Sequence, residues 1–108
     1  MPAGKIDPGE EALATARREL REEAGFEAGE WRHLATIHPC IGYADERMEL
    51  YLARQLTPVE HAPDPDEFLE RVTVDFSEAL RWIREGRVTD VKTIIGLMWA
   101  DRVFRDGW

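Results

Sequence analysis

The feature that most constrains the fold is the stretch from Gly4 to Phe26, which predicts one helix and both of its ends. Asp7-Pro8-Gly9-Glu10 is typical of a helix start, with an aspartate cap, a proline in the first turn and a glutamate three residues after the cap. The next residues are strong helix formers up to Gly25, which is a typical left-handed stop. The helix is therefore predicted to run from Pro8 to Ala24.

One side of this helix gathers three carboxylates. Glu19, Glu22 and Glu23 stand at i, i+3 and i+4, so they share a helix face. That face flanks an apolar stripe that should pack on a core, formed by Leu13, Ala16, Leu20 and Ala24. Like charges at this spacing repel by about 0.2–0.5 kcal/mol per pair, and a hard divalent cation would turn the repulsion into attraction. The alternative is a solvated charged face, which is common on surface helices.

The constrained positions extend beyond the three glutamates. Nine positions have a fixed spacing, namely Gly4, Glu10, Arg18-Glu19-Leu20, Glu22-Glu23 and Gly25-Phe26. This string fits the Nudix box at every position, so the chain resembles a Nudix hydrolase. The resemblance implies the α/β class and a Nudix-type α/β/α sandwich with a mixed sheet. Residues 1–108 would then form a single, partial Nudix domain.

Charge narrows the possible partners. The 108 residues include 22 acidic and 14 basic side chains, for a formal net charge of −8. This balance argues against nucleic acid as a partner, and it would make a metal ion useful to any site that binds phosphate. Cys40 is the one cysteine, which rules out an internal disulfide framework. Neither a signal peptide nor a membrane span is apparent, so we expect a cytoplasmic protein without a membrane partner.

The segment Pro2-Ala3-Gly4-Lys5, just before the helix, is similar to the ADP-ribose pyrophosphatase branch of the family. In that branch the carbonyl oxygen of this alanine is a metal ligand, so the resemblance implies that role for Ala3. The alternative is that Ala3 is only a turn residue. Strands normally precede this loop in the family, so the sheet is expected to be incomplete on its N-terminal side. An exposed sheet edge would favour pairing with a second copy, and a homodimer is expected.

Two strands are predicted after the helix, over Glu30–Ile37 and Arg47–Leu56, and the second alternates well except for a slip near Leu56. The loop between them has the pattern Pro-x-x-Gly-x-x-x-Glu. A similar loop in ADP-ribose pyrophosphatases reaches the substrate, often across a dimer interface. The resemblance therefore implies that Gly42 and Glu46 bind substrate, with Glu46 at the terminal ribose. An exposed acidic turn residue is an equally good interpretation of Glu46.

A second loop precedes a further predicted strand at Phe68–Val74 and contains three carboxylates, those of Asp64, Asp66 and Glu67. They could be solvated turn residues. In the family an acidic loop at this place faces the box helix, so the resemblance implies that Glu67 is a metal ligand or the general base. Two helices are predicted after this strand, over Ser77–Gly86 and from Val91 to Phe104, with Ser77 and Asp90 as their caps.

The resemblance implies Mg²⁺-dependent hydrolysis of a nucleoside diphosphate linked to another moiety, with Mn²⁺ as a possible replacement. ADP-ribose is the favoured substrate, with AMP and ribose 5-phosphate as products. The implied metal ligands are Ala3, Glu19, Glu22, Glu23 and Glu67, and the implied catalytic residues are Glu22 and Glu67. Arg18 and Glu10 would hold the box carboxylates in place. The alternatives are another Nudix specificity, such as a nucleotide sugar, or an inactive fragment that acts in binding or oligomerisation.

Overall fold

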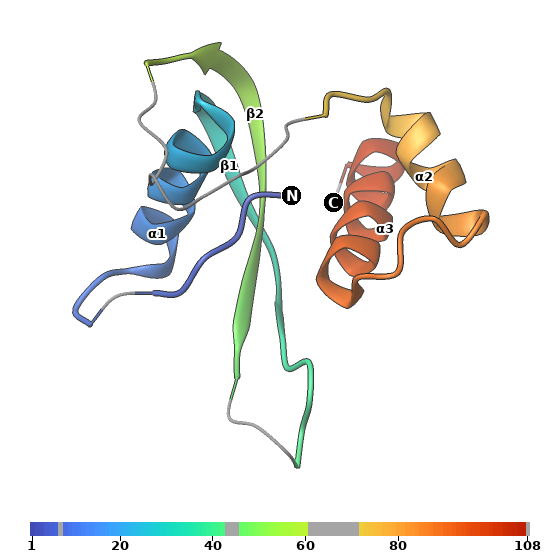
Figure 1. Cartoon of the computed structure of the whole chain (residues 1–108), viewed down its shortest axis with the longest axis horizontal. Helices are drawn as coiled ribbons and strands as arrows, with labels where there is room; N and C mark the ends of the chain where they lie inside the picture. The colour runs from blue at the N-terminus through green and yellow to red at the C-terminus, as the bar shows by residue number, and fades with distance from the viewer. Residues whose placement is uncertain (7, 43–45, 61–71, 108) are drawn as a thin grey trace. The chain divides into compact units, whose positions relative to one another are not determined.

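The computed structural model describes residues 1–6, 8–42, 46–60 and 72–107. In chain order it contains α1 (Ala12–Glu19), the π-helical turn η1 (Leu20–Ala24), β1 (Phe26–Ile37), β2 (Met48–Pro58), α2 (Phe76–Arg84) and α3 (Val91–Asp106) (Figure 1). Helices are combined with paired strands, which confirms the predicted α/β class. Among the helices of the described part, none is both long and apolar enough to span a bilayer.

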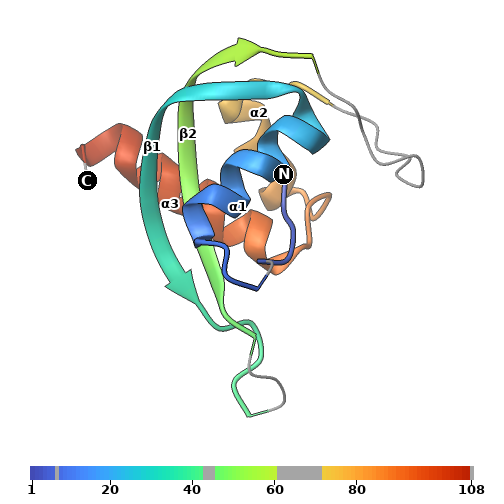
Figure 2. The same cartoon turned by 90° about the vertical axis from the view of Figure 1, so that its left-hand side faces the viewer.

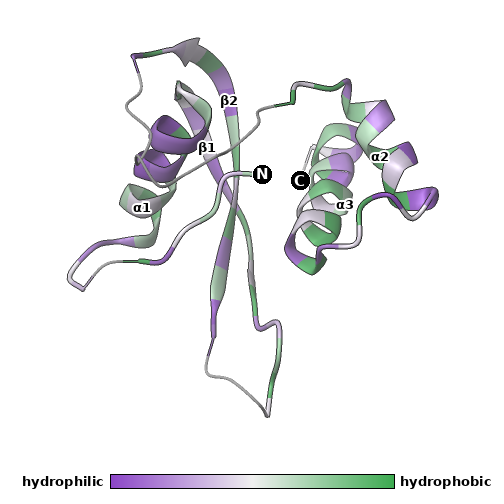
Figure 3. Cartoon of the chain, in the orientation of Figure 1, coloured by the Kyte–Doolittle hydropathy of each residue, from purple (hydrophilic) through white to green (hydrophobic). Residues whose placement is uncertain are grey.

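The described residues fall into two compact units. One contains the described residues of 1–32 and 53–72, and the other those of 33–52 and 73–107. The first unit therefore contains α1 and η1, and the second contains α2 and α3. Figure 3 shows that hydrophilic residues dominate the end of α1, whereas α3 carries more hydrophobic residues.

The box helix starts later than the sequence indicated. α1 begins at Ala12 and not at Pro8. Gly9 has a φ of 80° and lies in a turn, and this left-handed backbone cannot belong to a right-handed helix. The predicted start was therefore wrong, because the glycine after Pro8 bends the chain before the helix forms.

The end of the helix is a π-helical turn that the sequence did not indicate. The N–H of Gly25 donates to the carbonyl of Leu20 and to that of Arg21, both at 3.1 Å. Gly25 has a φ of 75°, which confirms the predicted left-handed stop. Because a π turn holds more residues than an α turn, Glu22 and Glu23 do not keep the angular relation to Glu19 that α-helical spacing assumes.

β1 and β2 form a two-stranded antiparallel sheet (Figure 2). β1 begins at Phe26, four residues before the predicted Glu30, because the chain becomes extended directly after η1. The slip predicted near Leu56 coincides with Gln55, whose φ of 59° interrupts the regular strand. A Cβ added to Gly29 would lie 2.8 Å from Oε1 of Gln55, so the glycine leaves room for the bent strand.

The predicted sheet of mixed strand directions requires more strands than β1 and β2. It therefore stays a prediction. Of the strand predicted at Phe68–Val74, residues 68–71 lie outside the described residues. Residues 72–74 are in neither a helix nor a strand.

The second unit contains a helix pair with a well-defined cap. Asp90 caps α3 as predicted, because its carboxylate accepts from the N–H of Thr93 at 3.0 Å and from the Thr93 hydroxyl at 2.7 Å. These bonds, with one from Lys92, lower the pKa of Asp90 to about 2. α2 begins at Phe76 after Asp75, so the prediction of Ser77 as its cap was wrong. The buried side chains of the pair are those of Ala79, Ala100 and Val103.

A polar cluster links β1 and β2 within the second unit. The Thr36 hydroxyl donates to Oε2 of Glu49 at 2.7 Å, and Nε2 of His33 contacts the same oxygen at 2.7 Å. Nε of Arg47 lies 3.4 Å from the other oxygen. The bonds from Thr36 and His33 hold the pKa of Glu49 below its ordinary value of 4.5.

This cluster predicts a pH-dependent contribution to stability. Because the pKa of Glu49 is lower in the folded chain than in the unfolded chain, the contribution is complete above about pH 5 and is lost as the pH falls through the folded pKa. Glu49→Gln should lower the urea midpoint at pH 7 and flatten its decline between pH 5 and pH 3. Urea titrations across this range measure both effects. Glu60→Gln, at an exposed position, is the control, and parallel curves for the two variants would contradict the prediction.

Candidate active site

Arg18 is the centre of the candidate site in the first unit. Its Nε and Nη2 each donate to a Glu10 carboxylate oxygen at 3.2 Å. Its Nη1 donates to Oε1 of Glu19 at 3.0 Å and to Oε2 of Glu22 at 3.3 Å. Nη2 also donates to the Lys5 carbonyl at 3.3 Å, which brings the loop before α1 into the same network. One guanidinium thus joins three of the box carboxylates.

Glu10 is held from a second direction. The Thr15 hydroxyl donates to its Oε1 at 2.6 Å. Thr15 is only 4% exposed and is the one buried polar residue of the described part. Its hydroxyl orients the Glu10 carboxylate, which in turn orients Arg18. The contacts are those that an orienting role of Glu10 and Arg18 requires, although that role stays a prediction.

Glu19 and Glu23 interact directly on the other side of this network. The Glu19 side chain is 12% exposed. Burial first, and then the charge of Glu23 and a hydrogen bond to it, raise the pKa of Glu19 despite the opposing effect of Arg18. The N–H of Ala3 donates to Oε2 of Glu23 at 2.8 Å. Two carboxylates that disfavour each other's charged form fit a hard divalent cation, which would favour both charges.

Glu22 does not join these two carboxylates. Its side chain is 44% exposed and pairs with Arg18. Accordingly, the described residues hold no group of three or more His, Cys, Asp or Glu side chains that could bind a metal ion. The shared face predicted from α-helical spacing is altered by the π turn. Glu19 and Glu23 are the residues that fit a cation, and both Glu19 and Glu22 would have to exchange Nη1 of Arg18 for the metal.

Gly4 packs against the Glu19 carboxylate more closely than any side chain would allow. A Cβ added to Gly4 would lie 2.0 Å from Oε1 and 2.2 Å from Cδ of Glu19. The sequence indicated Gly4 only as a box position, and the structure shows that its missing side chain leaves the space for a site carboxylate. Ala3 is adjacent and contacts the site through its N–H, so the metal-ligand role of its carbonyl stays a prediction.

The remaining predicted site residues lie elsewhere in the chain. Gly42 and Glu46 belong to the second unit and are exposed, and Gly42 has a φ of 94°, a conformation that favours glycine. Asp64, Asp66 and Glu67 lie outside the described residues. The roles predicted for these five residues therefore stay predictions.

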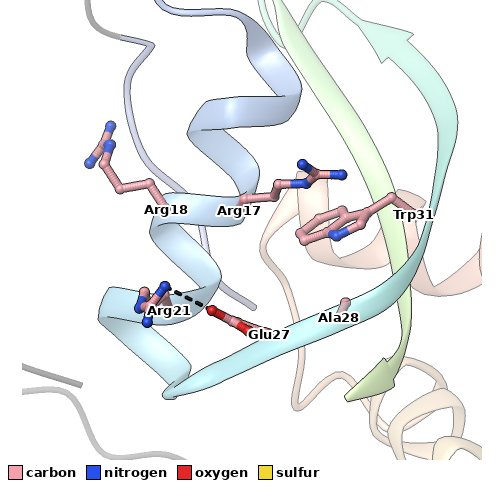
Figure 4. A pocket seen from close by; sticks show the side chains of 6 residues that line it. All are labelled: Arg17, Arg18, Arg21, Glu27, Ala28 and Trp31. Carbon is pink, nitrogen blue, oxygen red and sulfur yellow. Dashed lines mark hydrogen bonds and ion pairs between the residues drawn. The ribbon is translucent and has the colours of Figure 1, made fainter. Parts of the chain in front are cut away.

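The first unit also has a cavity that the sequence analysis missed. Its volume is about 550 Å³, and it is lined by Arg17, Arg18, Arg21, Glu27, Ala28 and Trp31 (Figure 4). The available signal was the spacing of Arg17 and Arg21, which places two cations on neighbouring turns of the helix.

Residues 1–94 match the NUDIX domain model. The chain belongs to the Nudix family. The match includes residues of both units and all nine box positions, so it confirms the family that the box predicted.

Individual relatives agree with this family. The chain is 40% identical over 101 residues to the methanol dehydrogenase activator of Bacillus methanolicus, covering 92% of the chain and 55% of the relative. It is 36% identical over 101 residues to the ADP-ribose pyrophosphatase of Bacillus subtilis (strain 168), with the same coverage of 92% and 55%. The chain thus spans about half the length of the curated relatives it matches.

A solved structure confirms the Nudix fold. The crystal structure of an ADP compounds hydrolase is similar to this chain with a TM-score of 0.85 and 25% sequence identity. The similarity covers 96% of this chain and 56% of that chain.

The contact between Gly4 and Glu19 leads to a prediction. In Gly4→Ala the new methyl group would displace the Glu19 carboxylate, whose flexible side chain can move, so Mn²⁺ affinity should fall about tenfold or more with little change in the urea midpoint. Mn²⁺ titration followed by electron paramagnetic resonance measures the affinity. Gly29→Ala is the matched control, because its methyl group would meet Gln55 and not a carboxylate. Unchanged Mn²⁺ affinity in Gly4→Ala would contradict the assignment of Glu19.

Proposed function

We propose that this chain carries the metal-binding part of a Nudix pyrophosphohydrolase that hydrolyses ADP-ribose. Water adds to a phosphorus atom of the diphosphate, the bond from that phosphorus to the bridging oxygen breaks, and AMP and ribose 5-phosphate leave. The observation that carries the proposal is the arrangement of Glu19 and Glu23 beside the Arg18 network within a complete Nudix box. The relatives and the solved structure named above support the choice of an ADP-linked substrate.

The proposed cofactor is Mg²⁺, with Mn²⁺ as a possible replacement. The proposed ligands are Glu19 and Glu23, joined by Glu22 and by the carbonyl of Ala3. A bound cation would offset the negative charge of the diphosphate and lower the pKa of a nearby water molecule. Such an offset matters in a chain with a net charge of −8.

The remaining roles belong to the protein's own side chains. Glu22 is the proposed base within the box, because its carboxylate is partly exposed and its tie to Arg18 is a single bond of 3.3 Å. Glu67 is the second proposed base. Gly42 and Glu46 are proposed to bind the substrate, and a homodimer is the proposed assembly. Arg18 would keep the carboxylates apart in the absence of metal, since one guanidinium offers each of them a donor.

Two other functions would use the same fold. A nucleotide sugar could replace ADP-ribose, because the box acts on the diphosphate and not on the group attached to it. The similarity to a methanol dehydrogenase activator raises the second possibility, an action on another enzyme. A substrate panel separates the first alternative from ADP-ribose hydrolysis. A chain that binds or oligomerises without hydrolysing any member of the panel would support a non-catalytic role.

The proposed activity predicts Mg²⁺-dependent release of AMP from ADP-ribose. Glu22→Gln and Glu23→Gln should each lower the rate by about a hundredfold or more, because each removes a charge from the reacting site. AMP is measured by chromatography, with the solution mass determined on the same preparation. Glu11→Gln, at an exposed position before α1, is the control and should retain the rate. Wild-type release no faster than that of the two box variants would refute the enzymatic proposal for this chain.

A further inference from the structure

The cavity of about 550 Å³ in the first unit lies between the box helix and β1. Figure 4 shows Arg17 and Trp31 turned toward one another on one side and Arg21 beside Glu27 on the other. The volume is in the range typical of sites for small ligands. Its lining combines cationic side chains and an aromatic ring, in a chain that is acidic as a whole.

The charge available in this cavity comes from Arg17 and Arg21. Arg17 is exposed, and its side chain makes no ion pair or hydrogen bond with the residues that the structure describes. Arg21 donates to Oε1 of Glu27 at 2.8 Å, but both side chains are more than half exposed, at 54% and 55%. A pair this exposed contributes little to stability, so an anion of higher charge can displace Glu27 at small cost. Arg18 contributes to the wall while its guanidinium holds the box carboxylates.

Trp31 adds a flat surface beside these cations. It lies on β1, is half-buried, and lines the cavity with Ala28, which has a small side chain. A half-buried indole held on a strand is suited to stack against a nucleobase. Guanidinium groups bind phosphate with two parallel hydrogen bonds. The guanidinium groups and the indole ring together match the phosphate and the base of one ligand.

We propose that this cavity binds a nucleoside phosphate, with the phosphate on Arg17 and Arg21 and the base on Trp31. The site shares only Arg18 with the candidate active site, because Arg17 and Glu19 differ by about 200° around an α-helix. It therefore needs neither Glu19 nor a divalent cation. Binding at this site does not depend on the hydrolysis proposed above, and either proposal can fail alone.

The test is calorimetric titration of AMP into the 108-residue chain in the presence of EDTA, which removes metal-dependent binding. Wild type should bind AMP, and Arg17→Gln and Arg21→Gln should each bind it about tenfold more weakly, since each loses a charged hydrogen bond. Glu27→Gln should bind AMP severalfold more tightly, because it removes the carboxylate that competes for Arg21. A purely structural role for Glu27 would not predict this gain.

Arg32→Gln is the matched control. Arg32 is exposed and follows Trp31 on the same strand, so its side chain points to the opposite face of the sheet. This variant should bind AMP like wild type, and equal weakening in Arg32→Gln and Arg17→Gln would overturn the proposal in favour of unspecific charge attraction. Absence of AMP binding by wild type would also overturn it. Inorganic phosphate that binds as tightly as AMP would overturn the role given to Trp31.

Discussion

The contact between Arg18 and its carboxylates is the interaction on which the rest of the site depends. Glu10, Glu19 and Glu22 each accept from this one guanidinium, and the Lys5 carbonyl does so as well. Without the positively charged guanidinium of Arg18 among them, the carboxylates on this helix would repel one another. Arg18 therefore allows the box to fold in the absence of metal. It also ties the loop before α1 to the helix, which keeps Gly4 against Glu19.

The same guanidinium connects carboxylates that also act on one another. Arg18 pairs with both Glu19 and Glu22, and Glu19 shares with Glu23 a hydrogen bond that helps raise the pKa of Glu19. A divalent cation at the proposed site would compete with Arg18 for these oxygens. Glu10 would then still offer Arg18 two oxygens while the other carboxylates turn to the metal.

The box helix presents different chemistry on its two sides. Three box carboxylates gather around Arg18, whereas Arg17 lies near Trp31 of β1 and Arg21 pairs with Glu27 (Figure 4). Only Arg18 belongs to both, since it lines the cavity and binds the carboxylates. This arrangement separates charges that would otherwise cancel. It also provides a chain of net charge −8 with a local surface suited to phosphate.

Local sequence signals predicted much of the architecture. The box spacing identified the family, Asp90 and Gly25 correctly marked helix ends, and both strands were found although their bounds shifted. These features depend on residues that are neighbours in the chain, which is why spacing alone reveals them. The prediction of where α1 starts was wrong because Gly9 allows both a helical and a left-handed backbone. Only the folded loop selects one of the two conformations.

By itself, the sequence determined the family and the set of carboxylates around one helix. Only the tertiary structure decided how they are grouped. The π turn changes the angular relation of Glu22 and Glu23 to Glu19, and Arg18 reaches back to Glu10 and to the Lys5 carbonyl, which helical i,i+4 spacing does not encode. The close approach of Gly4 to Glu19 and the cavity beside Trp31 likewise arise from segments that meet in space. The energies of these contacts depend on the distances between segments that are far apart in the sequence. Those distances are defined only in the folded chain.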